Sequence, residues 1–328
     1  MTAETRDALL EAATVQRLRR SAEVDTGLLV TDFGCPDPVA VKALASAEVL
    51  FTGWGCPPLT ADALARMPRL RAVVHAAGTV RHHVTAAAWE RGLLVSSAAA
   101  ANALPVAEYT VAAVLFSNKR VLAAARAYSA ERGRVNVLRS FPGIGNYRRT
   151  VGIVGASRIG RRVIELLRPF DLRVLVHDPY LDPAEASGLG VEAAGLDELA
   201  RSSDVVSIHA PELPGTRHLF DAARLALMPD GATLINTARG SLVDTAALTE
   251  ELVSGRLHAV LDHTDPEVLP AESPLYDLPN VLLTPHLAGS LGAELRRLAD
   301  AAVDELELYA RGLPFVHGVD PGLLDRSA

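Results

Sequence analysis

The sequence predicts an α/β protein made of two doubly wound parallel-sheet domains, and three observations lead to that prediction. The chain has 328 residues, which is long for one core and fits two domains of ordinary size. Short apolar runs rich in β-branched residues alternate with helix-compatible segments, as they do in βαβ units. This alternation stops at a long helical pattern and then restarts. We therefore expect two modules with a cleft between them.

The first module contains four runs that are expected to be parallel strands. They are separated by helical patterns such as Asp37–Ala45 and Asp62–Met67. The predicted strands are Leu28–Asp32, Val49–Thr52, Ala72–His75 and Leu93–Ser97. A long helical pattern then runs from about Ala103 to Arg132, and the turn formers of Arg139–Arg148 mark a surface connection to the second module.

Six further runs predict the sheet of the second module. They are Thr150–Val154, Arg173–His177, Val205–His209, Thr233–Asn236, His258–Leu261 and Val281–Thr284. After them, Ala293–Arg311 places leucines and alanines at helical spacing and stops at Gly312. This final helix has the length to return to the first module.

Composition narrows the class of function. The formal charge is −7, and acidic and basic residues are scattered, so neither nucleic acid nor an anionic membrane is an expected partner. The two cysteines, Cys35 and Cys56, form no metal-binding or disulfide pattern, which fits a reducing compartment. Met1–Arg20 lacks the apolar core of a signal peptide, and the apolar stretch Ala98–Phe116 is interrupted by Asn102, Pro105 and Glu108. We expect a cytoplasmic protein in which that stretch is a buried helix.

A dinucleotide-binding turn is predicted at the start of the second module. The strand Thr150–Val154 runs into Gly155-Ala-Ser-Arg-Ile-Gly160 and then into a helical pattern over Arg161–Leu167. Glycines at such a turn let the backbone approach a pyrophosphate at the helix N-terminus. Ser157 stands where the usual motif has its second glycine, although its hydroxyl can donate to a phosphate oxygen. Asp178 lies 18 residues after Gly160, where a carboxylate binds the adenosine ribose and favours NAD over NADP.

Several later motifs carry a resemblance to a known family. They are Val106-Ala-Glu108, Asn236-Thr-Ala-Arg-Gly240, Val243-Asp244, Leu261-Asp-His-Thr-Asp-Pro-Glu267 and Asn280-Val-Leu-Leu-Thr-Pro-His286 with Ala288-Gly289. With the nucleotide turn, they closely resemble the D-isomer-specific 2-hydroxyacid dehydrogenases, the family that includes D-3-phosphoglycerate dehydrogenase. The resemblance is weak in roughly the first 70 residues, the part in which such enzymes usually diverge.

The resemblance implies a fold, a cofactor and partners. A Rossmann NAD-binding domain, residues 103–288, would be inserted into a flavodoxin-like substrate domain made of residues 1–102 and 289–328. The cofactor would be NAD, the partner a small 2-hydroxy or 2-oxo acid, and the assembly a homodimer built around the long helix that follows Val106-Ala-Glu108. The apolar run Tyr109–Leu122 is compatible with such an interface.

Three residues are expected to carry the chemistry of a hydride transfer to or from a 2-hydroxy acid. Arg239 offers a planar guanidinium that can bind a carboxylate through two hydrogen bonds and polarise the carbonyl. His286 can donate or accept the proton, because imidazole titrates near physiological pH. Glu267 can orient that imidazole and favour its protonated form.

The resemblance also implies contacts to the cofactor and the substrate, and no metal. Asp262 corresponds to a residue that contacts the nicotinamide carboxamide. The expected cofactor-binding residues are Gly155, Ser157, Arg158, Ile159, Gly160, Asp178, His209, Ala210, Thr216, Thr237, Ala238, Arg239, Asp262, His286 and Gly289. In the first module, Ala76-Ala77-Gly78-Thr79 resembles the loop whose backbone amides hold the substrate carboxylate. The expected substrate-binding residues are Ala77, Gly78, Thr79, Arg81, Arg239 and His286.

The chain departs from the family pattern at three further places. Val80-Arg81-His82-His83 replaces a run that commonly reads like Val-Asp-Asn, and this more basic run predicts a substrate whose tail carries a second anionic group. A surface-exposed Arg81 is an equally good reading, and the adjacent histidines are expected to be solvated. His263 stands in place of an aliphatic residue and is expected to be a packed, neutral histidine, while Val268 replaces a common proline.

Other functions remain open at this point. Taken singly, Arg239 and Glu267 could form an exposed ion pair and His286 could be a turn residue, but the three motifs in family order favour a joint site. A non-catalytic NAD(H)-sensing regulator on the same fold is the main alternative, because such a sensor can retain the triad. Formate dehydrogenases also resemble the chain, but they carry glutamine at the position of Glu267.

Overall fold

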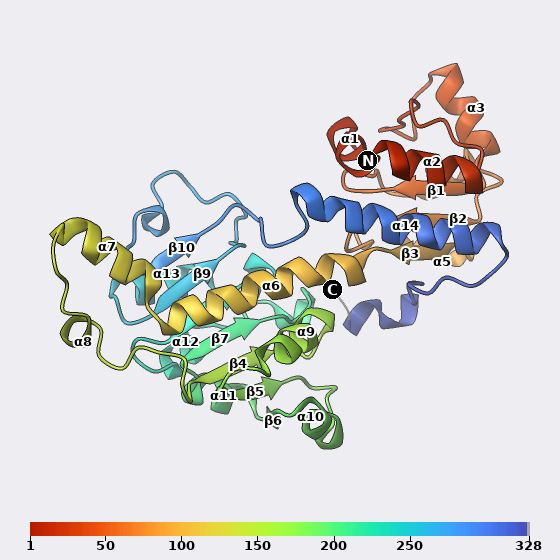
Figure 1. The fold of residues 1–328 in the computed structure, drawn as a ribbon. Coiled ribbons are helices and arrows are strands. Elements are labelled where there is room, and N and C mark those ends of the chain that lie inside the picture. Colours follow the sequence, from red (N-terminus) through yellow and green to blue (C-terminus); the bar gives the residue numbers. More distant parts are fainter. Residues whose placement is uncertain (327–328) are drawn as a thin grey trace. The chain divides into compact units, whose positions relative to one another are not determined.

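The computed structural model describes residues 1–326, and in it the chain folds as two compact units (Figure 1). The first unit contains Met1–Ala103 and the segment that begins at Ser290, and the second contains Leu104–Gly289. The last two residues of the predicted segment 289–328 lie outside the described residues.

The first unit is built on a parallel sheet of three strands in the order β1-β2-β3. The strands are β1 (Val49–Thr52), β2 (Ala72–His75) and β3 (Leu94–Ser97). Every residue of the central strand β2 is buried, as expected for a parallel strand covered on both faces. The helices before and between the strands are α1 (Ala3–Leu9), α2 (Ala12–Ser21), α3 (Pro38–Ser46), α4 (Ala61–Ala65) and α5 (Ala86–Glu90).

The predicted strand at Leu28–Asp32 is wrong, because this segment forms no strand. Turns bracket it on both sides: Asp25 accepts a hydrogen bond from the Gly27 N–H, and Asp32 accepts one from the Gly34 N–H. Aspartate side chains that bond the nearby backbone compete with a sheet ladder. The side chains of Val30 and Leu29 still pack against two different core clusters. The apolar pattern of this segment therefore reflects burial, but the backbone does not pair with a neighbouring strand.

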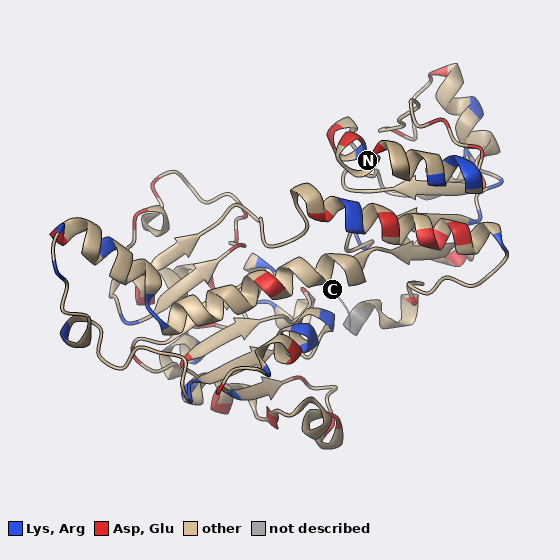
Figure 2. Ribbon diagram, viewed as in Figure 1, with Lys and Arg blue, Asp and Glu red and all other residues tan. Residues whose placement is uncertain are grey.

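The helix predicted over Ala293–Arg311 is present as α14 (Leu295–Ala310), which belongs to the first unit. Its buried side chains Leu298, Ala302 and Leu306 follow the helical spacing and share a core cluster with Leu18 of α2. Several acidic residues recur along this helix (Figure 2). Arg17 of α2 forms ion pairs with three of them, Asp300, Asp304 and Glu307.

The second unit is a doubly wound α/β fold with seven parallel strands in the order β10-β9-β8-β7-β4-β5-β6. The strands are β4 (Thr150–Val154), β5 (Arg173–His177), β6 (Glu192–Ala193), β7 (Val205–Ile208), β8 (Thr233–Asn236), β9 (His258–Leu261) and β10 (Val281–Leu283). Six of these were predicted, and only the two-residue edge strand β6 was missed. The α/β fold with parallel sheets is therefore confirmed.

Helices cover both faces of this sheet (Figure 1). Alternate residues of the strands pack into two separate core clusters, as the period of two requires. One cluster takes in side chains of α6 (Ala99–Asn118) and α9 (Arg158–Leu167). The other takes in side chains of α11 (Leu196–Ser202), α12 (Ala222–Leu227) and α13 (Thr245–Val253), while α10 (Pro183–Leu189) stands near the edge strand β6.

The long helix predicted from Ala103 to Arg132 is two helices, α6 and α7 (Val121–Glu131), followed by the short α8 (Val137–Ser140). The break lies at Arg120, whose φ of 51° is left-handed. Its guanidinium bonds the carbonyl of Gly231, and this tertiary contact holds a backbone conformation that no sequence signal marks. Helix α6 is long and apolar enough for a membrane span, but a buried helix of a globular protein passes the same test, and 39% of its most apolar window is buried.

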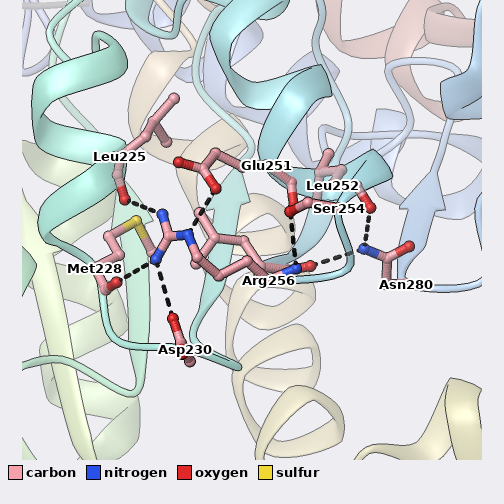
Figure 3. A network of polar contacts seen from close by, with 9 residues as sticks. Leu225, Met228, Asp230, Glu251, Leu252, Ser254, Arg256 and Asn280 are labelled. Atoms are coloured by element: carbon pink, nitrogen blue, oxygen red, sulfur yellow. Dashed lines mark hydrogen bonds and ion pairs between the residues drawn. The ribbon is translucent and has the colours of Figure 1, made fainter.

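A polar network around Arg256 fixes the start of β9 (Figure 3). The guanidinium donates to the carbonyls of Leu225 and Met228, at the end of α12, at 2.6 Å each, and pairs with Glu251 of α13 at 2.6 Å. Helix C-termini carry unpaired carbonyls and partial negative charge, which a guanidinium satisfies. The hydrogen bond from Arg256 lowers the pKa of Glu251. This network lies at the N-terminal end of β9, whereas the predicted catalytic residues follow the C-terminal ends of the strands. We therefore interpret the network as structural.

Candidate active site at the carboxyl ends of the strands

The nucleotide turn follows β4 directly, and its two glycines are required by the backbone itself. Gly155 has φ of +100°, and a Cβ there would lie 2.7 Å from the Ala210 nitrogen. A Cβ on Gly160 would lie 2.0 Å from the Gly155 carbonyl oxygen. The turn is therefore as tight as a pyrophosphate-binding turn must be, with the N-terminus of α9 directed at the space beyond it.

Ser157, the residue in place of the motif's second glycine, is the N-cap of α9. Its Oγ accepts a hydrogen bond from the Gly160 N–H at 3.3 Å. Helix α9 starts at Arg158, three residues earlier than the predicted Arg161. Because the hydroxyl accepts this bond, its own proton remains available to a ligand at the helix N-terminus, and Arg158 and Ile159 occupy the first turn.

Asp178 follows β5 and turns its carboxylate toward the same glycine turn. One oxygen accepts from the Ala156 N–H at 2.7 Å, and the other accepts from the Tyr180 N–H at 2.8 Å. Each carboxylate oxygen keeps a second lone pair. The carboxylate is therefore held in one orientation and can still accept from a ribose hydroxyl.

The three predicted catalytic residues lie on loops after adjacent strands of the sheet order β10-β9-β8. Arg239 follows β8, Glu267 follows β9 and His286 follows β10. His286 Nδ1 and Glu267 Oε1 are 2.8 Å apart, with both side chains about half exposed or more. The hydrogen bond from His286 is the main cause that lowers the pKa of Glu267, followed by the charges around it. The structure thus brings an imidazole and an ionised carboxylate together.

Asp262 holds the loop that carries His286. Its carboxylate is buried and accepts three hydrogen bonds, from Thr284 Oγ1 at 2.6 Å, from the Leu287 N–H at 2.8 Å and from the Ala288 N–H at 2.9 Å. His286 itself has a left-handed φ of 54°. A strained residue of this kind persists when its surroundings fix it. Asp262 therefore positions the histidine, and its expected contact with the nicotinamide carboxamide stays a prediction.

Arg239 lies in a turn whose backbone is held by the side chain of Asn236. The Asn236 side chain accepts from the Ala238 N–H at 3.1 Å and donates to the Arg239 carbonyl at 2.8 Å. Next along the chain, a Cβ on Gly240 would lie 2.0 Å from the Thr264 carbonyl oxygen, so this loop packs tightly against the loop that carries Glu267. The guanidinium donates to the Ala238 carbonyl, and among residues 1–326 it has no carboxylate ion pair. Its remaining donors can bind a substrate carboxylate.

His263 is buried against the catalytic histidine. The ring centroids of His263 and His286 are 3.8 Å apart, with the planes tilted by 58°. Burial, followed by the charges of His286 and Arg239, lowers the pKa of His263 to about 4. It is thus a packed, neutral histidine, whereas the neighbouring departure Val268 is 81% exposed.

Three of the remaining predicted cofactor residues, Thr216, Thr237 and His209, make side-chain hydrogen bonds inside the protein. Thr216 Oγ1 donates to the Pro211 carbonyl at 2.7 Å, and Thr237 Oγ1 lies 3.2 Å from Thr110 Oγ1. His209 is buried beside Ser207, and burial lowers its pKa to about 3. The contacts of these residues with a cofactor stay a prediction, as do those of Ala210, Ala238 and Gly289.

Sequence reasoning missed one support of the site, Tyr109. Its hydroxyl lies 3.0 Å from Thr284 Oγ1, which in turn donates to Asp262. This relay connects α6 with the loop of His286. No local sequence signal marks it, because Tyr109 was interpreted only as part of an apolar helix face.

The predicted substrate-carboxylate loop lies in the first unit, directly after β2. Ala77 is buried, Thr79 Oγ1 accepts from the Arg81 N–H at 3.4 Å, and the Gly78 backbone passes close to Asn102. His82 is exposed, but His83 is only 4% exposed, so the expectation that both histidines are solvated is wrong for His83. The His83 ring packs against His75, with centroids 4.3 Å apart. The contact with His75, eight positions earlier in the chain, shields the His83 ring from water.

Because His75 and His83 are buried, we expect the free energy of unfolding to decrease in acid. Burial first, and then neighbouring positive charge, lowers the pKa of His75 to about 3 and that of His83 to about 4. Because the unfolded histidine titrates near 6.5, the unfolded state binds more protons below that pH. The stabilising effect of each neutral histidine is therefore complete above about pH 6.5 and declines as the pH falls toward the folded value. By pH 5 the loss is about 2 kcal/mol for each histidine.

Urea unfolding of the wild type and of two variants between pH 5 and 7.5 measures this effect. His83→Gln is expected to reduce the pH dependence of the unfolding free energy, while the exposed neighbour His82→Gln leaves it unchanged. Equal pH dependence in all three proteins would mean that His83 is protonated in the folded state.

Comparison with known proteins gives a consistent family match. Residues 111–288 match the family model of the D-isomer specific 2-hydroxyacid dehydrogenase NAD binding domain. D-3-phosphoglycerate dehydrogenase of Mycobacterium leprae (strain TN) is 34% identical over 268 residues, which are 81% of this chain and 50% of that protein. The chain thus spans about half the length of the phosphoglycerate dehydrogenases that it matches.

Two further relatives match over most of their own length. Glyoxylate reductase of Aeropyrum pernix is 34% identical over 272 residues, 81% of this chain and 79% of that protein. The solved structure of a protein from Thermus thermophilus superposes with a TM-score of 0.77 at 33% identity, covering 95% of this chain and 97% of the other.

Proposed function

The chain belongs to the D-isomer-specific 2-hydroxyacid dehydrogenase family, and from this premise we propose that it interconverts a D-2-hydroxy acid and its 2-oxo acid with NAD. The single observation that carries the proposal is the His286–Glu267 pair at 2.8 Å, on loops beside Arg239 and at the same sheet edge as the nucleotide turn. Open α/β sheets bind their ligands at this edge. The proposed domain roles are NAD binding for the second unit and substrate recognition for the first.

The proposed mechanism divides the work between the cofactor and the protein. NAD, when bound, supplies the acceptor or donor of the hydride at the substrate C2. His286 gives its proton to the carbonyl oxygen during reduction and takes the hydroxyl proton during oxidation. Glu267 stabilises the imidazolium form through the bond to Nδ1, leaving Nε2 for the substrate. Arg239 binds the carboxylate and stabilises the negative charge on the oxygen during the transfer.

The fixed carboxylate of Asp178 leads us to expect a preference for NAD over NADP. It accepts from a ribose 2′-hydroxyl but repels a 2′-phosphate. Asp178→Asn keeps an acceptor and removes the charge, so the ratio of kcat/KM for NAD to that for NADP is expected to fall at least about tenfold, equivalent to roughly 1.4 kcal/mol.

The matched control for this substitution is Asp182→Asn. Asp182 caps α10 four residues later, through a bond from the Glu185 N–H, and asparagine caps helices equally well. A cofactor preference that shifts equally in both variants would indicate a general charge effect instead of ribose recognition.

For the substrate we propose a 2-oxo acid whose tail carries a second anionic group. The support is the basic run Val80-Arg81-His82-His83 directly after the predicted carboxylate loop. In the structure Arg81 is partly exposed and His82 is exposed. An Arg81→Ala variant should raise KM for doubly anionic substrates more than for singly anionic ones.

We further propose a cytoplasmic homodimer that uses the outer face of α6 and α7. A hollow of about 220 Å³ on the second unit is lined by Tyr109, Phe116 and Leu122 of these helices and by Val260 and Leu282 of the sheet. Phe116 is 57% exposed, and a large exposed apolar side chain in a hollow is typical of a protein interface. Phe116→Asp should shift the sedimentation coefficient from that of a dimer to that of a monomer, and a monomeric wild type would reject the proposal.

The experiment that tests the activity is NADH oxidation by the purified protein against a panel of 2-oxo acids, including phosphorylated and phosphonate members. His286→Asn serves as the inactive control. Turnover that depends on His286 establishes the dehydrogenase and ranks the substrates. Tight NADH binding without turnover on any member would instead identify an NAD(H)-sensing regulator.

A further inference from the structure

We propose that His263, Glu267 and His286 form a binding site for a divalent transition metal of the Zn²⁺ type, and that the bound metal inhibits the enzyme. The three side chains offer two imidazole nitrogens and one carboxylate oxygen, and these atoms all lie within 4.8 Å of one another. The inhibition rests on the proposed function, whereas the binding does not.

The ligand set defines the class of metal. Imidazole nitrogen together with carboxylate oxygen suits Zn²⁺, Co²⁺, Ni²⁺ and Fe²⁺. Ca²⁺ and Mg²⁺ are disfavoured, because they require oxygen ligands. Three protein ligands leave at least one coordination position open for water, as in catalytic and inhibitory zinc sites rather than in closed structural ones.

His263 is the residue that makes a three-ligand site out of the catalytic pair. Its ring is buried and fixed against His286, with centroids 3.8 Å apart. Among residues 1–326, neither ring nitrogen of His263 takes part in a hydrogen bond, so a nitrogen lone pair is available to a metal. An aliphatic residue at this position could not supply it.

The other two ligands have the freedom that coordination needs. Glu267 is 68% exposed at its side chain and His286 is 51% exposed, so a hydrated ion can reach both from solvent. In the free protein they share a hydrogen bond of 2.8 Å. A metal ion would replace the proton in that bond, and small rotations of the Glu267 side chain would bring its oxygen into the coordination sphere. The Asp262 contacts keep the His286 loop in place during this change.

The consequence for the proposed reaction is direct. With a metal in place of the proton on Nδ1, the neutral imidazole of His286 carries its one proton on Nε2. Giving that proton to the substrate oxygen would leave an imidazolate, and Nε2 has no free lone pair with which to accept a proton from the substrate hydroxyl. Glu267 would at the same time be lost as the orienting partner of His286. Binding of the metal and proton transfer by His286 therefore exclude one another.

Binding is tested on the tag-free, cofactor-free full chain by titration with Co²⁺, which reports nitrogen and oxygen coordination through its visible absorption, and with Zn²⁺ by calorimetry. We expect one ion for each wild-type chain. His263→Leu is expected to weaken binding at least about tenfold, since even groups outside the coordination sphere change metal affinity 10- to 100-fold. NADH binding verifies that this variant is folded.

The matched control is His218→Leu. His218 Nδ1 lies 3.8 Å from Asp244 Oδ2, so it is a partly exposed histidine beside a carboxylate, but it belongs to no three-ligand group among the described residues. Its substitution should leave Co²⁺ and Zn²⁺ binding unchanged. Binding that is equally tight in His263→Leu, or no binding of either ion to the wild type at micromolar concentrations, would overturn the proposal.

The inhibition is tested separately in the turnover assay. The ratio of activity with Zn²⁺ to activity without it should fall in the wild type, recover on chelation, and stay near one in His263→Leu. An equal fall in both proteins would overturn the inhibitory role of this site. Because the Co²⁺ titration needs no turnover, a chain without dehydrogenase activity would still give a clear result on the metal site.

Discussion

Replacing His286 by asparagine is expected to lower kcat for 2-oxo acid reduction about 10²- to 10⁴-fold, the range that a positioned general acid contributes. Asparagine keeps a polar side chain of similar size but cannot give a proton to the substrate oxygen. Its amide can still bond Glu267, which lies 2.8 Å from the imidazole in the wild type. The loop itself is held by backbone bonds to Asp262, so the substitution leaves the surrounding structure in place.

Steady-state and single-turnover kinetics with NADH measure this loss, and NADH fluorescence titration is the control for cofactor binding. Glu267→Gln should give a smaller loss than His286→Asn, because it keeps the hydrogen bond and removes only the charge that stabilises imidazolium. A His286→Asn enzyme with wild-type kcat would show that the proton comes from another group.

Replacing Arg239 by lysine is expected to lower kcat/KM about 10²- to 10³-fold, comparable with the loss of one donor to a developing oxyanion. Lysine keeps the positive charge but lacks the planar fork that binds a carboxylate through two parallel hydrogen bonds. The turn that presents Arg239 is set by Asn236 and by the close approach of Gly240 to Thr264. The shorter reach of lysine from this turn adds to the loss.

A pair of substrates with and without the carboxylate measures the contribution of the two parallel hydrogen bonds made by the guanidinium. The Arg239→Lys variant should lose more activity on the 2-oxo acid than on the corresponding aldehyde, because the aldehyde lacks the carboxylate and loses only the stabilisation of its carbonyl oxygen. Arg217→Lys, on an exposed arginine beside Asp265, is the matched control. Similar losses on both substrates would assign Arg239 to the carbonyl oxygen or to the cofactor instead of carboxylate recognition.

Most strands could be predicted because both the composition and the period of a buried parallel strand are local. The runs at Val49–Thr52, Ala72–His75 and Thr150–Val154 coincide with β1, β2 and β4 residue for residue. Leu28–Asp32 has the same apolar character, yet the turns at Asp25 and Asp32 prevent a ladder. The helix break at Arg120 likewise depends on a contact with Gly231, more than 100 residues away.

The sequence by itself determined the α/β class, the family, the nucleotide turn and the identity of the residues at the strand ends, because these depend on local pattern and on motif chemistry. Only the tertiary structure decided how those residues meet. It placed His263 against His286, gave Asp262 the task of holding the His286 loop, and buried His83 against His75. Contacts of this kind join residues from separate loops, and their distances, burial and pKa values depend on packing that no local stretch of sequence encodes.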